Sequence, residues 1–219
     1  MTFNGVLVIV GGGALDEHLL HKLAAEGAHV IGADGGGDVI RAAGLVPEAI
    51  IGDFDSLADP LSWDTRTKLV RIPEQETTDF EKALYSTSAP VTVGLGMTGK
   101  RFDHTLAALD AVARYAAKRR IILVDEFDVA LALTGPIAFA VEPGARVSVH
   151  PLTATRFRHS TGLKYPLDGL TLAPGIRTGT SNEASMTDFS IEPEPGDRGV
   201  YLLIIERRWL EALIKALEQ

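Results

Sequence analysis

The chain has 219 residues, of which 46% are hydrophobic, and it carries a formal net charge of −8. This apolar content is enough for a packed core and excludes a disordered chain. The negative charge argues against a general nucleic-acid-binding surface or an anionic membrane surface, because both depend on accumulated Lys and Arg. The absence of cysteine excludes disulfides, thiolate metal sites and a cysteine nucleophile.

The first residues, MTFNGVLVIVGGGALDE, contain a short apolar run without a basic leader or a small-residue cleavage pattern. We therefore expect a first strand here and not a signal peptide. No other apolar run approaches the roughly 18 residues that a membrane-spanning helix needs. The sequence thus predicts a cytoplasmic protein that binds neither membrane nor nucleic acid.

The first half of the chain alternates short β-branched runs with helical patterns, which is typical of a mostly parallel sheet flanked by helices. Strands are expected at residues 6–10, 29–33, 48–52, 91–95 and 120–124, and helices at residues 15–26, 37–43, 79–86 and 103–118. In the last helix, apolar residues recur at helical spacing and predict one buried stripe of Leu106, Leu109, Ala113 and Ala117.

The second half of the chain has a different texture. Short alternating runs are separated by Pro and Gly turns, which favours an antiparallel β unit that begins between residues 126 and 136. The last residues, RRWLEALIKALEQ, place Trp209, Leu213 and Leu217 at helical spacing and predict a docked terminal helix.

A glycine pattern, G-x-G-x-x-G, lies in the segment VTVGLGMTGKRFDH at Gly94, Gly96 and Gly99. It is compatible with a dinucleotide-binding loop, for which Asp125 would be the ribose-binding acid, or with a tight strand-to-helix turn near a phosphate. The earlier glycine run GGGALD has Asp16 where a third glycine is needed, so the first βαβ unit lacks a full dinucleotide fingerprint.

Two acids follow a predicted strand in IIGDFDSL, where Asp53 and Asp55 stand two residues apart. In open α/β sheets ligands bind at the carboxyl ends of the strands. Two carboxylates this close repel each other unless a cation lies between them, and Mg²⁺ prefers one or two carboxylates completed by water and phosphate oxygens. The alternative is a solvated loop in which Asp55 and Ser56 make turn or capping bonds.

Other strand ends add polar side chains to the same edge. Asp34 directly follows the second predicted strand, and EQETTDFEKAL places Gln75, Asp79 and Lys82 on one helix face if the segment is helical. The segment KRFDH supplies Arg101, Asp103 and His104 after the glycines. Carboxylates mixed with cations suit a magnesium-bound polyphosphate, whereas a solvated helix face and an Arg–Asp surface pair are the structural alternatives.

Six segments in order resemble the thiamine pyrophosphokinase family: ADGGGD, IIGDFDS, Gln75 with TTDFEKAL, GMTGKRFDHTLAAL, GLKYPL and TSNEA. The resemblance covers most of the chain. It implies transfer of pyrophosphate from ATP to thiamine with release of AMP, and a homodimer with its sites at the subunit interface. It also implies an α/β ATP-binding catalytic domain at residues 1–128 and a thiamine-binding antiparallel β-sandwich with a short terminal helix at residues 129–219.

The resemblance assigns roles to individual positions. It implies that Asp53, Asp55 and Asp79 are the catalytic and Mg²⁺-carrying acids, with Asp53 and Asp79 as candidates to accept the hydroxyl proton. Nucleotide and triphosphate contacts would come from Asp34, Gln75, Lys82, Thr98, Arg101, Asp103 and His104. Thiamine contacts would come from Ser181, Asn182 and Glu183, and residues 164–167 would help to build the cleft. Some relatives stack thiamine on a tryptophan near the SNE segment. This chain has no tryptophan there, and Phe189 is one candidate for its replacement.

Two other functions remain open at this stage. The pair Asp53 and Asp55 could serve a phosphatase as nucleophile and acid, although Ser56 follows where such enzymes usually have Thr or Val. A nucleotide-binding protein without catalysis is the other alternative, but it has little reason to keep three acids beside a polyphosphate.

Overall fold

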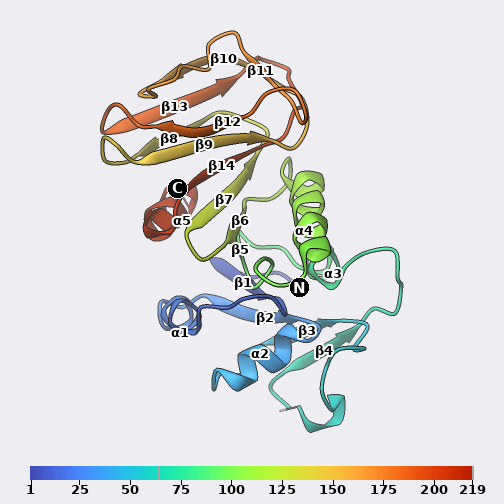
Figure 1. The fold of residues 1–219 in the computed structure, drawn as a ribbon. Coiled ribbons are helices and arrows are strands. Elements are labelled where there is room, and N and C mark those ends of the chain that lie inside the picture. Colours follow the sequence, from blue (N-terminus) through green and yellow to red (C-terminus); the bar gives the residue numbers. More distant parts are fainter. Residues whose placement is uncertain (64, 219) are drawn as a thin grey trace. The chain divides into compact units, whose positions relative to one another are not determined.

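The computed structural model describes residues 1–63 and 65–218. The chain divides into two compact units, one of residues 1–111 with 123–126 and the other of residues 112–122 with 127–219. Figure 1 shows strands and helices alternating in the first unit and strands predominating in the second. The division passes through helix α4 (Phe102–Tyr115) and strand β6 (Ile121–Val124).

The first unit is built on five parallel strands in the order β5-β1-β2-β3-β4. Their bounds are Val6–Val10 for β1, His29–Ala33 for β2, Ala49–Gly52 for β3, Lys68–Arg71 for β4 and Val91–Leu95 for β5. In register, Val8 pairs with Val30 on one side and with Val93 on the other. Strands β1, β3 and β5 are buried almost throughout, as expected of a parallel sheet covered on both faces.

Helices connect these strands, and side-chain caps fix where two of them begin. They are α1 (Glu17–Ala25), α2 (Gly36–Ala42), α3 (Asp79–Ser86) and α4, with a short 3₁₀ turn η1 (Pro60–Ser62). Asp16 accepts a hydrogen bond from the Leu19 N–H at 3.1 Å, and Thr78 accepts one from the Glu81 N–H at 3.4 Å. Both caps satisfy backbone donors that the first turn leaves free.

The predicted elements of this half are confirmed with shifts of up to three residues at their ends, with two differences. Strand β4 was not predicted, because KLVR is polar and mostly exposed. The predicted buried stripe of α4 is wrong: Leu106 is 49% exposed, and the residues buried beneath the helix are Ala108, Ala111 and Val112. Small side chains on this face allow the helix to lie close to its neighbours.

The turn from β2 into α2 depends on glycine, and replacing Gly36 by Ala is expected to destabilise the protein. A Cβ atom at Gly36 would lie 1.9 Å from the Val10 carbonyl oxygen, a backbone atom that cannot move without shifting β1. The free energy of unfolding should fall by about 3 kcal/mol, the upper end of overpacking costs. Urea unfolding measures this. Gly12→Ala is the control, since a Cβ there meets nothing within 4 Å, and equal stability of the two variants would contradict the argument.

The second unit contains two sets of antiparallel strands, in the orders β12-β9-β14-β7 and β11-β10-β13-β8, of which the second is a sheet of its own. The first has bounds Asp128–Leu133 for β7, Arg146–Pro151 for β9, Gly179–Glu183 for β12 and Tyr201–Glu206 for β14. The second has Ile137–Ala140 for β8, Thr155–Thr161 for β10, Thr171–Leu172 for β11 and Asp188–Pro193 for β13.

Aromatic side chains fill the space between these two sets of strands. Phe157 on β10 packs edge-on against Tyr201 on β14, with ring centroids 5.2 Å apart, and both residues are fully buried. The chain ends in the turn η2 (Arg207–Trp209) and helix α5 (Leu210–Glu218), which buries Leu213 and Leu217 as predicted. The fold class predicted from the sequence is therefore confirmed.

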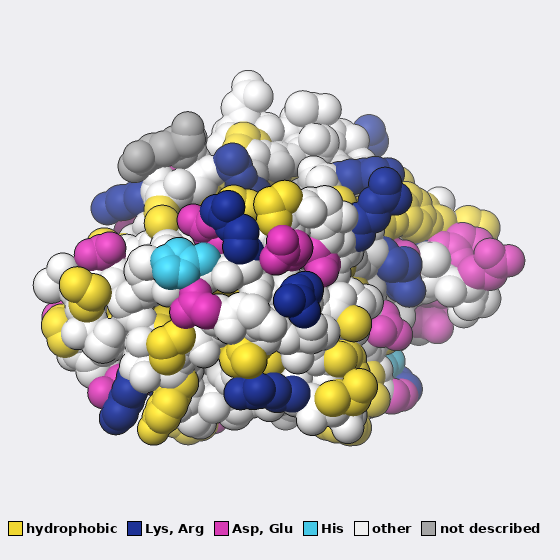
Figure 2. Space-filling model, turned by 90° about the horizontal axis from the view of Figure 1, so that it is seen from above, with side chains coloured by type: hydrophobic (Ala, Val, Ile, Leu, Met, Phe, Trp, Pro, Cys, Tyr) yellow, Lys and Arg dark blue, Asp and Glu magenta, His cyan; other side chains and the backbone are white. Residues whose placement is uncertain are grey.

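The outer surface mixes charges of both signs. On the face shown in Figure 2, Lys and Arg side chains lie among Asp and Glu side chains. Pairs of this kind in the second unit include Arg158 with Glu192 and Arg208 with Glu142. Such exposed pairs add little stability. No helix in residues 1–63 and 65–218 is long and apolar enough to cross a membrane.

Candidate functional site

Three carboxylates meet at the carboxyl edge of the first unit's sheet. Asp34 directly follows β2, and Asp53 and Asp55 follow β3, its neighbour in the sheet. One oxygen from each of the three lies within 4.8 Å of the others. The grouping results from the parallel sheet, which brings the ends of adjacent strands to one edge.

Asp34 is the buried member of this group, with 2% of its surface exposed. Its backbone has a φ of 45°, which is rare for a residue other than glycine. One carboxylate oxygen accepts the Ser56 N–H at 2.9 Å, and Oδ1 is buried with no partner in the described part of the chain. Burial, and then the charges of Asp79, Asp55 and Asp53, raise the pKa of Asp34 against the opposing effect of the Ser56 hydrogen bond.

Asp53 lies at the centre of a second set of contacts, which links β3 to α3. Its Oδ1 accepts the Asp55 N–H at 3.2 Å, and its Oδ2 accepts hydrogen bonds from Gln75 at 2.5 Å and from Lys82 at 3.3 Å. Burial by itself would raise the pKa of Asp53, but these three donors outweigh it and hold that pKa below its ordinary range.

Lys82 joins Asp53 to Asp79. Its ammonium lies 3.3 Å from Asp53 Oδ2 and 3.0 Å from Asp79 Oδ1, and its side chain is only 2% exposed. Burial would lower the pKa of Lys82, yet the hydrogen bonds and charges of the two acids raise it. Lys82 is therefore a buried cation that neutralises part of the acid cluster.

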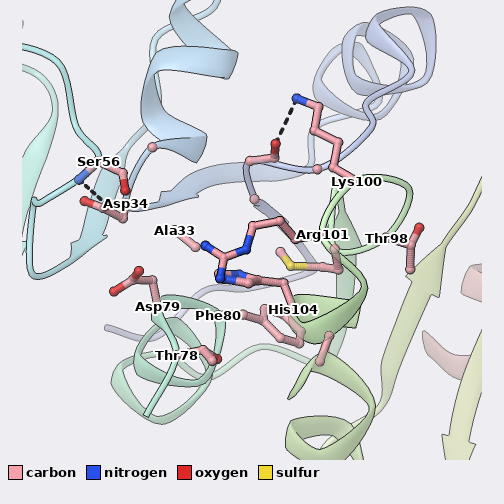
Figure 3. A pocket seen from close by; sticks show the side chains of 17 residues that line it. Ala33, Asp34, Ser56, Thr78, Asp79, Phe80, Thr98, Lys100, Arg101 and His104 are labelled. Atoms are coloured by element: carbon pink, nitrogen blue, oxygen red, sulfur yellow. Dashed lines mark hydrogen bonds between the residues drawn. The ribbon is translucent and has the colours of Figure 1, made fainter. Parts of the chain in front are cut away.

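A cleft of about 260 Å³ opens beside these acids. Figure 3 shows Asp34 and Asp79 on one side of it and Lys100, Arg101 and Thr98 on the other. Its lining comes from the ends of β1, β2 and β5 and the starts of α3 and α4: Gly11, Gly12, Gly13, Ala33, Asp34, Gly35, Ser56, Thr78, Asp79, Phe80, Gly96, Met97, Thr98, Lys100, Arg101, His104 and Ala108.

Two glycine loops of this lining are bonded to each other through their backbones. The N–H groups of Gly11 and Gly13 donate to the carbonyls of Leu95 and Gly96 at 2.8 and 2.7 Å. A Cβ atom at Gly13 would lie 2.4 Å from the Gly96 oxygen, so the close approach requires glycine. The N–H groups of Gly11 and Gly13 are therefore engaged, which disfavours a dinucleotide cradle at the end of β1.

The cations of the cleft have partners of their own. Lys100 donates to the Gly12 carbonyl at 3.0 Å. Arg101 binds Asp103 through two hydrogen bonds, of 3.1 and 2.6 Å, with both side chains well exposed. Figure 3 shows Arg101 and His104 pointing into the cleft. An exposed pair of this kind is weak, so Arg101 can exchange Asp103 for an anionic ligand at little cost.

The predicted site residues of the first unit fall into two groups. Asp34, Asp79, Thr98, Arg101 and His104 line the cleft. The others are absent from its lining and form the acid cluster or contact a lining residue: Asp53, Asp55, Gln75, Lys82 and Asp103.

Several residues that line the cleft were not predicted from the sequence, among them Gly11, Gly12, Gly13, Thr78 and Lys100. A signal was present in the glycine-rich ends of β1 and β5, which are neighbours in the sheet. Asp125 also has a contact that was not anticipated, because its Oδ1 accepts the Thr98 hydroxyl at 2.6 Å.

The predicted thiamine contacts lie in the second unit. Asn182 is 4% exposed, and its side chain accepts the Tyr165 N–H at 3.0 Å and donates to the Tyr165 carbonyl at 2.7 Å. Glu183 pairs with Lys164 at 3.2 Å, and Ser181 is exposed with a φ of 59°. The SNE segment thus holds the loop of residues 164–167. The guess that Phe189 stacks on a ligand is wrong for this structure, since its ring is fully buried.

Replacing Asp34 by Asn is expected to raise stability at neutral pH. The pKa of Asp34 is higher in the folded protein than its ordinary value of 3.8, so ionisation above that pH costs folding free energy. The amide can keep the Ser56 hydrogen bond without the charge. Urea unfolding at pH 7 should show the variant more stable than the wild type, and the difference should vanish below pH 3.8.

The same variant tests a metal ligand role for Asp34 without an activity assay. Mg²⁺ should raise the melting temperature of the wild type more than that of Asp34→Asn, since a ligand stabilises the state that binds it. If Asp34 is not a ligand, Mg²⁺ should raise the melting temperatures of the wild type and of Asp34→Asn equally. Asp110→Asn, an exposed change on α4, is the control for the loss of a carboxylate.

Comparisons with known proteins agree with this geometry. The family described as thiamin pyrophosphokinase, catalytic domain, matches residues 20–124. "Thiamin pyrophosphokinase 1" of Caenorhabditis elegans is 31% identical over 155 residues, which are 64% of this chain and 63% of that protein. The chain thus spans less than two thirds of the length of this relative.

Solved structures extend the likeness to the second unit. Thiamin pyrophosphokinase from Geobacillus thermodenitrificans is 25% identical, with a TM-score of 0.76 over 92% of this chain and 97% of that one. The Candida albicans protein of the same name is 16% identical with a TM-score of 0.77, over 93% of this chain and 89% of that one, and shows a shared fold. The chain is thus similar to thiamin pyrophosphokinases in sequence over residues 20–124 and in fold over more than nine tenths of its length.

Proposed function

We propose that the chain transfers the pyrophosphoryl group of ATP to the hydroxyl of thiamine, giving thiamine diphosphate and AMP. The observation that carries this proposal is the meeting of Asp34, Asp53 and Asp55 beside a cleft whose other side holds Lys100 and Arg101. Lys and Arg side chains can bind the anionic phosphates, and the carboxylates can bind the metal ion that accompanies a triphosphate. The relatives' names supply the substrate.

The acid cluster fits Mg²⁺. Asp34 Oδ1 is buried without a partner among residues 1–63 and 65–218, a costly state that an oxygen-preferring cation would relieve. Asp34, Asp53 and Asp55 would hold the ion, and Asp79, predicted as a ligand, pairs with Lys82. When bound, the ion supplies positive charge that offsets the negative charge of the triphosphate.

The protein's own groups position the reactants and accept a proton. Lys100, Arg101 and His104 would bind the phosphates, and the thiamine hydroxyl would attack the β-phosphorus. As the new O–P bond forms, the bond breaks between the β-phosphorus and the oxygen that links it to the α-phosphorus. AMP leaves with this oxygen and the electron pair of the broken bond. We assign the hydroxyl proton to Asp79, because Asp79 lines the cleft whereas both oxygens of Asp53 already accept hydrogen bonds.

The finer assignments to nucleotide and thiamine are also part of the proposal. Residues 1–128 would bind ATP, and residues 129–219 would bind thiamine through Ser181, Asn182 and Glu183.

A homodimer with shared sites would explain why Phe102 and Leu106 are 75% and 49% exposed on α4, beside the cleft residue His104. Sedimentation of the purified chain tests the dimer. The cytoplasmic location stays a prediction.

Incubation with ATP, thiamine and Mg²⁺ tests the proposed reaction. We expect AMP and thiamine diphosphate in equal amounts, and no AMP without thiamine or without Mg²⁺. Release of inorganic phosphate alone would favour the phosphatase alternative. Binding of ATP without thiamine-dependent AMP would favour a non-catalytic nucleotide-binding protein.

A further inference from the structure

Glu74 organises the loop between β4 and α3 through four accepted hydrogen bonds. Its Oε2 accepts the N–H groups of Glu76 and Thr77, at 2.7 and 3.0 Å. Its Oε1 accepts the Thr77 hydroxyl and, at 3.0 Å, the Tyr85 hydroxyl. The carboxylate thus closes a turn on its own loop and ties it to the last part of α3.

This loop carries the groups that reach the acid cluster and the cleft. Gln75, next to Glu74, donates to Asp53 Oδ2 at 2.5 Å. Thr78 caps α3 and lines the cleft, and Asp79 begins the helix and lines the cleft too. Between Glu74 and Asp79 there are only four residues, so the path of the backbone in this turn decides where Gln75 and Asp79 stand.

We infer that Glu74, held by Tyr85, is a positioning residue that keeps Gln75 against Asp53 and presents Thr78 and Asp79 to the cleft. The inference rests on the proposed function for its effect on catalysis. Glu74 does not line the cleft and has no role assigned from the family resemblance, so it acts on substrate only through the loop.

Four donors around one carboxylate favour its ionised form, because a charged acceptor makes the stronger hydrogen bonds. The hydrogen bond from the Thr77 hydroxyl is the largest cause, and together with those from Tyr85 and the Glu76 and Thr77 N–H groups it outweighs the opposing effect of burial and lowers the pKa of Glu74 to about 2. The group is therefore ionised throughout the pH range of an ordinary assay. A glutamine at this position keeps the size of the side chain, but its NH₂ group cannot accept the bonds that one of the oxygens accepts.

Amide hydrogen exchange and steady-state kinetics on Glu74→Gln test the inference together. Exchange of the Glu76 and Thr77 N–H groups should become faster in the variant without ligands, because a neutral amide oxygen accepts hydrogen bonds more weakly than the ionised carboxylate. The turnover number should fall by about 10- to 10²-fold, the effect expected of misplaced reacting groups, with a smaller change in KM for ATP. The melting temperature should change little.

A double variant separates positioning from a general structural effect. Because part of the effect of Glu74 runs through Gln75, adding Glu74→Gln to Gln75→Ala should lower turnover less than it does in the wild type. Tyr85→Phe, which removes one donor from a half-exposed ring, should give a smaller loss in the same direction. Glu76→Gln is the control, since it removes the same charge two residues along without removing an acceptor for the turn.

The outcomes distinguish this inference from the proposed function. An active wild type with normal turnover and unchanged exchange in Glu74→Gln would overturn the inference alone. An inactive wild type would overturn the proposed function, and faster exchange at Glu76 and Thr77 in the variant would then still support the role of Glu74 in the loop. Full additivity with Gln75→Ala would also overturn it, because the two residues would then act separately.

Discussion

Replacing Asp55 by Asn is expected to leave the protein folded and to lower the turnover of ATP and thiamine by a factor of about 10² to 10³. Asp55 is one of the three acids that meet at the sheet edge, and within the described residues its exposed side chain accepts the hydroxyl of its neighbour Ser56, at 2.8 Å. Its removal therefore leaves no buried partner unsatisfied. Circular dichroism checks the fold, and the turnover number is measured with saturating substrates and Mg²⁺.

Asp79→Asn should lose at least as much turnover, since it would remove the proposed proton acceptor. Asp110→Asn on the exposed face of α4 serves as the control and should keep its activity. Near-normal turnover of Asp55→Asn and Asp79→Asn with Mg²⁺ present would refute the assignment of the acids.

Replacing Lys82 by Met is expected to destabilise the protein strongly. The side chain of Lys82 is 2% exposed, and its partners Asp53 and Asp79 are 11% and 29% exposed. Removing one partner of a buried ion pair leaves uncompensated charge, which costs about 3 to 5 kcal/mol. We expect about 3 kcal/mol here, because Asp53 keeps the Gln75 and Asp55 donors and Asp79 has access to water. Urea unfolding at pH 7 gives the value.

A second substitution shows whether charge is the cause. Adding Asp79→Asn to Lys82→Met should restore part of the lost free energy of unfolding, because one of the two unpaired carboxylates is then gone. If the double variant is less stable than Lys82→Met by the full effect of Asp79→Asn, the loss comes from packing and not from the ion pair.

The sequence predicted the features of the site that follow from periodicity and position. Asp34, Asp53 and Asp55 each follow a buried β-branched run, and parallel strands end at one edge, so their meeting could be expected. The helix α3 began at the predicted residue because Thr78 is a good N-cap. Both predictions depend on local chemistry that a single sequence displays.

Other features depend on contacts between distant residues, which a single sequence does not display. The pattern of α4 offered two apolar faces, and the choice of Ala108, Ala111 and Val112 over Leu106 follows from the packing of the folded unit. The role of the glycines 11–13 needs β1 beside β5. The turn made by Glu74 depends on Tyr85, eleven residues later.

Strained backbone conformations occur in the acid-cluster and SNE segments, and the sequence does not predict them. Asp34, Phe54 and Ser181 have positive φ values of 45°, 69° and 59° although none is glycine. Such conformations cost about 1 to 3 kcal/mol each and persist where the surroundings enforce them, often at functional sites. Two of these residues lie in or beside the acid cluster, and the third begins the SNE segment.

The identity of the phosphorus products tests the central claim most directly. Phosphorus NMR of a completed reaction with ATP, thiamine and Mg²⁺ should show AMP and a diphosphate ester of thiamine in equal amounts, without ADP. The same reaction with Asp55→Asn should show ATP almost unchanged over that time. Formation of ADP with thiamine monophosphate, or of inorganic phosphate with no new ester, would contradict pyrophosphoryl transfer at this site.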